Sequence, residues 1–105
     1  MAEINWTDKA LQNVDNIAEF ISKDSLKYAQ IQTKIFFERV ESLFKQPELG
    51  RVVPELQKKK IRELIVGNYR IVYRIISQKR IDILTIHHSR RLLQNNPNIK
   101  KHKSR

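Results

Sequence analysis

Residues 61–88 have the pattern of consecutive β-strands. Over residues 70–75, Ile71, Tyr73 and Ile75 alternate with Arg70, Val72 and Arg74, and residues 81–86 alternate in the same way, which is the period of two of a pleated strand. Two short polar segments interrupt the pattern, at Gly67-Asn68 and around Ser77 to Arg80. Gly67 tolerates a positive φ, so Gly-Asn can close the two-residue turn of a β-hairpin. The pattern therefore predicts three consecutive strands that are joined by short turns.

Two earlier stretches repeat their apolar residues at the spacing of an amphipathic helix. The first helix is predicted over residues 8–22, because Thr7 precedes the apolar pattern and is a good N-cap. The second helix is predicted to begin after Asp24 or Ser25 and to end before Pro47. With a tight turn between them, the two helices are expected to form an antiparallel pair packed on the sheet.

The remaining segments complete the predicted architecture. Residues 3–6 are expected to form a short first strand, residues 46–60 an exposed connection, and residues 89–94 a short helical turn. This order of elements predicts an α+β fold, in which an N-terminal helical hairpin packs on an antiparallel β-sheet. We expect one domain over residues 1–95, followed by a basic and mobile tail over residues 96–105.

Charge is distributed unevenly along the chain. Residues 1–50 carry six Lys/Arg and eight Asp/Glu, a net of −2, whereas residues 51–105 carry fifteen and three, a net of +12. This polarity favours an anionic partner, which could be nucleic acid, an acidic protein or a membrane surface. A membrane partner fits least well, because the basic half has no basic amphipathic helix with bulky apolar residues.

Several classes of protein do not fit the sequence. The chain has no cysteine, which excludes disulfides and thiolate metal sites. It has no secretory signal pattern and no apolar stretch near the roughly 20 residues that span a bilayer, so a cytoplasmic protein is expected. No Gly-rich phosphate loop, HExxH motif or Cys/His metal pattern occurs, so no metal or cofactor is expected.

One constellation of charged residues could carry chemistry: Arg51, Glu55, Arg62, Arg70, His88 and Arg90. Arginines held on a sheet can bind phosphates bidentately and stabilise the extra negative charge of a phosphoryl-transfer transition state. A nearby carboxylate or imidazole could act as general base on a ribose 2′-hydroxyl, which would give metal-free RNA cleavage. Alternatively, Glu55 and Glu63 are ion-pair partners of Arg51, Arg62 or Arg70, and serve only to hold the sheet together.

The tyrosines and histidines near the turn and the last strand have two interpretations. Tyr69 and Tyr73 share a face opposite Arg70 and could stack on bases; Tyr73 fits the core better, and Tyr69 is the candidate for an exposed contact. His87 and His88 are adjacent, so they point to opposite faces of a strand and cannot easily share a metal ion. The plainer interpretation is that one histidine is packed and the other lies on the surface.

The runs VPELQKKKIRELIVGNYRIVYRI and IDILTIHHSRRLL resemble the RelE/ParE superfamily of bacterial toxin–antitoxin toxins. The pattern W-T-x-x-A-x-x-x-x-x-x-I near the N-terminus is similar as well, as is the connection with Pro47 and Gly50-Arg51. The resemblance spans residues 4–93, and its most specific piece is GNYRIVYR at residues 67–74. It implies a small α+β toxin that a cognate antitoxin neutralises, with operator DNA contacted only through the antitoxin.

The superfamily has two branches with different targets. ParE-like members block DNA gyrase, whereas RelE-like members cut mRNA on the ribosome without a metal. In a RelE-like toxin the resemblance assigns the transition-state contact to Arg70 and the acid/base role to Glu55 or His88. However, Ser89 stands where those nucleases carry a catalytic Arg or His, and the GRVVPE, IREL and His-x-x-Arg patterns resemble the ParE-like branch. A gyrase inhibitor is therefore favoured, with a ribosome-dependent mRNA endonuclease as the alternative.

A third possibility is an inactive plasmid-stabilisation protein that only binds its partner. If the chain is a gyrase inhibitor, we expect its binding contacts to come from the basic face and the C-terminal segment. The candidate binding residues are Arg51, Arg62, Tyr69, Arg70, Arg90 and Arg91.

Overall fold

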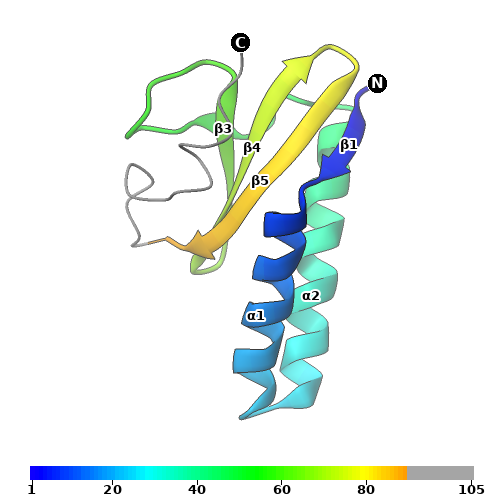
Figure 1. Ribbon diagram of the computed structural model, residues 1–105, viewed down its shortest axis with the longest axis vertical. Coiled ribbons are helices and arrows are strands. Elements are labelled where there is room, and N and C mark those ends of the chain that lie inside the picture. Colours follow the sequence, from blue (N-terminus) through cyan, green and yellow to red (C-terminus); the bar gives the residue numbers. More distant parts are fainter. Residues whose placement is uncertain (90–105) are drawn as a thin grey trace.

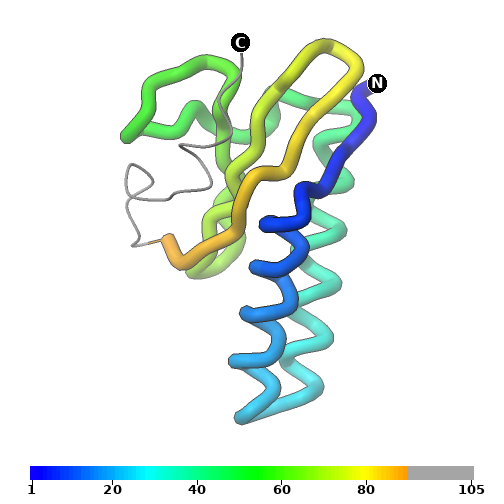
Figure 2. Tube along the Cα trace, in the orientation of Figure 1, coloured from blue at the N-terminus to red at the C-terminus, as the bar shows by residue number. Residues whose placement is uncertain are grey.

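The computed structural model describes residues 1–89, in which two helices lie against one face of a five-stranded sheet (Figure 1). The elements follow the order β1 (Glu3–Trp6), α1 (Asp8–Ser22), α2 (Leu26–Glu41), a 3₁₀ turn (Ser42–Phe44), β2 (Arg51–Val52), β3 (Ile61–Val66), β4 (Tyr69–Ser77) and β5 (Arg80–His88). The tube trace shows that the helical hairpin extends well beyond the end of the sheet (Figure 2). None of the helices in residues 1–89 is long and apolar enough to cross a membrane.

Both helices begin at side-chain caps. The Thr7 hydroxyl accepts a hydrogen bond from the Ala10 amide at 3.1 Å, and the Ser25 hydroxyl accepts one from the Tyr28 amide at the same distance. Each cap satisfies a backbone N–H that has no partner within its helix. The predicted helix over residues 8–22 is confirmed, and Ser25 is the cap of α2.

The strands are arranged in the order β1-β5-β4-β3-β2. The neighbours from β2 to β5 are antiparallel, but β1 pairs with β5 in parallel, so the predicted antiparallel sheet is a mixed one. The helical hairpin explains this direction, because it returns the chain to the start of β1, where the Ala2 amide donates to the Phe44 carbonyl. A second difference is β2, two residues that pair with Glu63 and Arg62 inside the segment predicted to be a connection.

The side chains of Thr7, the N-cap of α1, and of Asn13 within α1 continue the edge of β5 where β1 ends. The Thr7 hydroxyl donates to the Ile83 carbonyl at 2.7 Å. Further along, the side-chain oxygen of Asn13 accepts from the Thr85 hydroxyl at 2.8 Å and from the Ile86 amide at 3.0 Å. Asn13 thereby takes the hydrogen-bonding place of a strand residue, so this part of the edge is satisfied without a longer β1.

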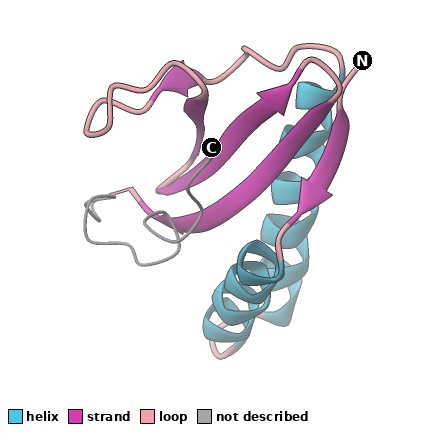
Figure 3. Ribbon diagram, turned by 45° about the horizontal axis from the view of Figure 1, so that its top comes forward, coloured by secondary structure: helices cyan, strands magenta, loops and turns pink. Residues whose placement is uncertain are grey.

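The two faces of the sheet bury different clusters, and both helices cover the same face (Figure 3). On the helix-covered face, sheet residues such as Ile71 and Ile83 pack with Phe36 and Val40 of α2. The helix-free face buries a smaller cluster, which consists of Val53, Ile61, Val72 and Leu84 with Leu56 packed against it. The loop after β2 therefore covers part of the helix-free face.

The predicted turn at Gly67-Asn68 is confirmed, with Gly67 at a φ of 60° between β3 and β4. Of the helical turn predicted over residues 89–94, only Ser89 is described, and its amide donates to the Asn68 carbonyl at 2.7 Å. The other residues of that segment lie outside the described part of the chain, as does the predicted basic tail.

Candidate functional site

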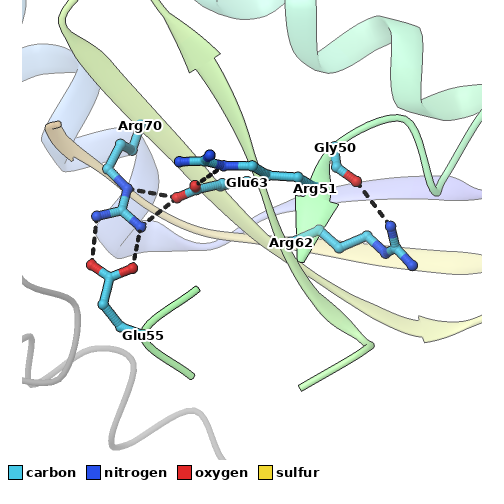
Figure 4. A network of polar contacts seen from close by, with 6 residues as sticks. All are labelled: Gly50, Arg51, Glu55, Arg62, Glu63 and Arg70. Carbon is cyan, nitrogen blue, oxygen red and sulfur yellow. Dashed lines mark hydrogen bonds and ion pairs between the residues drawn. The ribbon is translucent and has the colours of Figure 1, made fainter. Parts of the chain in front are cut away.

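The helix-free face of the sheet gathers two acidic and two basic side chains from neighbouring elements (Figure 4). Arg51 of β2 lies opposite Glu63 of β3, and Arg70 of β4 lies opposite Ile65, two residues further along the same face of β3. Glu55 reaches this face from the loop between β2 and β3. We call Arg51, Glu55, Glu63 and Arg70 the Arg70 network.

Two carboxylates hold the guanidinium of Arg70. Its Nη1 and Nη2 donate to the two oxygens of Glu55 at 2.7 and 2.8 Å, a bidentate pair, and its Nε donates to Oε1 of Glu63 at 2.5 Å. Only 6% of the Arg70 side chain is exposed. The hydrogen bonds to Glu55, followed by those to Glu63, raise the pKa of Arg70 against the lowering effect of burial. The group is therefore a fixed, permanently charged cation.

Glu63 is the centre of the Arg70 network. Its carboxylate is buried and accepts from Arg70 through one oxygen and from Nε of Arg51 through the other. The side chain of Arg51, in contrast, is 62% exposed. With two cations and two anions, the network has no net charge. The structure therefore shows Glu55 and Glu63 as ion-pair partners of Arg51 and Arg70, which is one of the two interpretations of the sequence.

Arg62 lies apart from this network. Its Nη1 donates to the Gly50 carbonyl at 2.9 Å (Figure 4). Its Nε donates to the Lys59 carbonyl at 3.1 Å. Arg62, a member of the constellation of charged residues found in the sequence, therefore does not share the face of Arg51 and Arg70. The reason is the register: Arg70 lies opposite Ile65, and Arg62 is an odd number of residues away, so it points to the other face.

The structure brings Glu55 to Arg70, but it does not bring His88 to them. Arg70 lies opposite His87, whereas His88 lies opposite Tyr69 and is exposed on the other face. His87, with 6% exposure, is the packed histidine. The interpretation of one packed and one surface histidine is confirmed. A general acid/base pair made of Glu55 and His88 would have to act from opposite sides of the sheet.

The two tyrosines of β4 both serve the packing. Tyr69, predicted to be the more exposed of the two, is half-buried, with its ring edge-on to Phe36 at a centroid distance of 5.4 Å. Tyr73 is fully buried, as predicted. Its hydroxyl donates to the Pro47 carbonyl at 2.7 Å and accepts from the Gly50 amide at 2.9 Å. Burial raises the pKa of Tyr73, because water no longer stabilises the phenolate.

At Gly50 the chain passes close to the backbone of β3 and to the Tyr73 ring. A Cβ at this position would lie 2.5 Å from the Glu63 carbonyl oxygen and 2.8 Å from the Tyr73 ring. No other residue fits without a shift of backbone or ring. This close approach sets the start of β2, and with it the position from which Arg51 reaches Glu63.

Two candidate binding residues, Arg90 and Arg91, lie outside the described residues. Within residues 1–89, no group of three or more His, Cys, Asp and Glu side chains is arranged to hold a metal ion.

Comparison with known proteins assigns the chain to a family. A family model described as the ParE toxin of the type II toxin–antitoxin system parDE matches residues 4–93. The chain belongs to the ParE toxin family. A solved structure described as the chromosomal ParDE toxin–antitoxin system from P. aeruginosa is similar to it, with a TM-score of 0.69 and 23% sequence identity. The similarity covers 84% of this chain and 96% of that chain, and it shows a shared α+β fold. Comparison with the curated proteins found no match.

The matched ParE region contains the whole Arg70 network, including one member that the candidate list from the sequence lacks. Glu63 is identified from the sequence only as a possible ion-pair partner, whereas in the structure it joins Arg51 to Arg70. Its signal in the sequence is a carboxylate in the apolar run IRELIV, at a position that alternation assigns to the same face as Ile61. In this ParE toxin, a charge in such a position is buried and paired.

Proposed function

We propose that this ParE toxin inhibits bacterial growth by binding DNA gyrase, without chemistry of its own, and that a cognate antitoxin neutralises it. The observation that carries the proposal is the bidentate pair between Glu55 and Arg70. If the toxin cleaved mRNA, both residues would have to act on the RNA. In this structure they are instead hydrogen-bonded to each other.

The cost of freeing Arg70 supports binding over cleavage. A scissile phosphate could contact the guanidinium fork only if Glu55 moved away, because Glu55 accepts from both terminal nitrogens. Losing the hydrogen bonds between Glu55 and the charged guanidinium costs about 1.5–3 kcal/mol, which substrate binding would have to offset. The exposure of His88 on the other face removes the second acid/base candidate from the same site.

The distribution of charge supports an acidic antitoxin. Residues 51–105 carry a net charge of +12, and the two cations of the Arg70 network are matched by its own carboxylates. The excess positive charge therefore lies outside that network, where it is available to an acidic protein. In this proposal the antitoxin supplies the contact to operator DNA, and the toxin acts in the cytoplasm, where its target is.

A supercoiling and cleavage assay with purified gyrase tests the proposal. Adding the toxin is expected to inhibit supercoiling, and adding the antitoxin is expected to restore it. Two variants with the same change of charge are compared. Arg51→Gln removes a candidate binding residue in the Arg70 network and is expected to weaken the inhibition, whereas Arg39→Gln on α2 is the control and is expected to leave the inhibition unchanged. Gyrase that keeps its full activity at every toxin concentration would refute the gyrase target.

One alternative, a ribosome-dependent mRNA endonuclease, uses the same two residues. Arg70 would contact the scissile phosphate and Glu55 would act as general base, and both lie on the same face of the sheet. This alternative predicts that messages are cleaved on ribosomes during expression of the wild-type toxin, and that Arg70→Lys stops the cleavage while antitoxin binding survives. Intact messages in growth-arrested cells would exclude it.

A further inference from the structure

A hollow of 850 Å³ lies at the opposite end of β4 from Arg70. Four segments line it: Met1, residues 45–49 after the 3₁₀ turn, Lys60 just before β3, and the end of β4 with the turn that follows it. It therefore shares no residue with the Arg70 network.

The walls of the hollow are held in place by hydrogen bonds within the toxin. Tyr73 fixes the Pro47 carbonyl and the Gly50 amide, and Arg62 donates to the Gly50 carbonyl. On the other side, the Ile75 amide donates to the Lys60 carbonyl at 2.8 Å. Because these two walls are held before a ligand arrives, ordering them costs little conformational entropy on binding.

The lining combines an apolar centre with a cationic rim. Met1, Pro47, Leu49 and Ile75 contribute apolar surface, and Met1 and Leu49 are 79% and 47% exposed. Lys45 and Lys60 supply positive charge, against the single carboxylate of Glu48 in the lining. Such a site fits a ligand that carries negative charge around one apolar group.

The lining favours a peptide over a nucleic acid. Single-stranded nucleic acids bind largely by stacking their bases on aromatic side chains, and among residues 1–89 no aromatic residue lines the hollow. The toxin's own C-terminal sequence, IKKHKSR, would be repelled by Lys45 and Lys60. The occupant that matches both the charge and the apolar surface is an acidic segment of another protein.

We propose that this hollow binds an acidic peptide segment of a partner protein, which inserts one large aliphatic side chain beside Leu49 and places its carboxylates near Lys45 and Lys60. The proposal does not depend on the gyrase target, because it concerns a surface on which the Arg70 network plays no part.

Fluorescence anisotropy with defined probes tests this proposal. The probe is a short labelled peptide of Glu, Asp and Gly with one central Leu, and a single-stranded oligothymidine is the competing class of ligand. The double variant Lys45→Glu/Lys60→Glu is expected to weaken peptide binding about tenfold at low salt. The control, Lys9→Glu/Lys27→Glu, makes the same change in net charge on exposed helix positions and is expected to leave binding within about twofold.

A double-mutant cycle tests the apolar contact. Leu49→Ser in the toxin and Leu→Ser in the peptide are each expected to weaken binding about tenfold, and their combination to cost little more than either alone. Independent effects would overturn the proposed contact, since they would place the peptide's leucine elsewhere. Three results would overturn the site itself. In the first, the peptide does not bind at all, and in the second, the two lysine double variants weaken its binding equally. In the third, only oligothymidine binds, in a way that depends on Lys45 and Lys60.

Discussion

Replacing Glu63 by Gln should destabilise the toxin more than the change to Gln at Glu55 or at Arg51. Glu63 is 1% exposed and accepts from two guanidinium groups, one through each oxygen. Glutamine keeps the shape but loses the charge, and its amide N–H₂ would face one of the arginine donors. Removing one partner from a buried ion pair costs about 3–5 kcal/mol.

Substitutions of Glu55 and Arg51 show how the cost in stability depends on burial, because the two side chains differ in exposure. The side chain of Glu55 is 17% exposed, and Glu55→Gln should cost about 1.5–3 kcal/mol, the range for hydrogen bonds to charged groups. The side chain of Arg51 is 62% exposed, and Arg51→Gln should cost about 0–1 kcal/mol, because water screens an exposed pair. The expected order of destabilisation is Glu63, then Glu55, then Arg51.

Urea denaturation followed by circular dichroism measures these differences as shifts of the midpoint at constant slope. A further variant, Glu63→Leu/Arg70→Met, separates charge from packing. It removes the central carboxylate and the buried guanidinium together, so it should recover much of the stability that Glu63→Gln loses. If Arg51→Gln costs as much as Glu63→Gln, burial does not set the strength of these pairs and the reasoning fails.

The remaining predictions concern the anchors of the loop and of the helix. Gly50→Ala should cost about 1–3 kcal/mol through overpacking, measured by thermal denaturation, since its Cβ would lie 2.8 Å from the Tyr73 ring; an unchanged Tm would contradict the close approach. Tyr73→Phe should cost about 1–3 kcal/mol, because the buried Gly50 amide loses its acceptor. The raised pKa of Tyr73 means that its neutral form stabilises the fold at all pH values below the unfolded pKa of about 10, and that this stability is lost as pH rises further. Wild-type stability should therefore fall more steeply than that of Tyr73→Phe in alkaline titrations; parallel curves would refute this. Asn13→Ala should cost about 1–3 kcal/mol in urea denaturation, because the Ile86 amide loses its acceptor, whereas Asn16→Ala on the same helix is the control and should change little.

Elements whose determinants lie close together in the sequence could be predicted from it. The helix over residues 8–22 has its cap, its apolar period and its turn within one short segment, and the structure has the same bounds. The hairpin at Gly67-Asn68 likewise depends on one glycine with a φ of 60° between two alternating strands. The resemblance to the RelE/ParE superfamily rests on the same local runs, and the family model matches residues 4–93.

Contacts between distant segments were decided only by the tertiary structure. The parallel pairing of β1 with β5 joins residues more than 70 positions apart, and neither strand carries a local signal for its partner's direction. The face of Arg62 also depends on the register of β3 against β4, where an odd number of positions changes the side. The sequence by itself determined the helices, the central hairpin, the family and the charge polarity, because each depends on neighbouring residues or on composition. The structure alone decided that Arg70 is enclosed by Glu55 and Glu63, because burial and pairing depend on which strands meet.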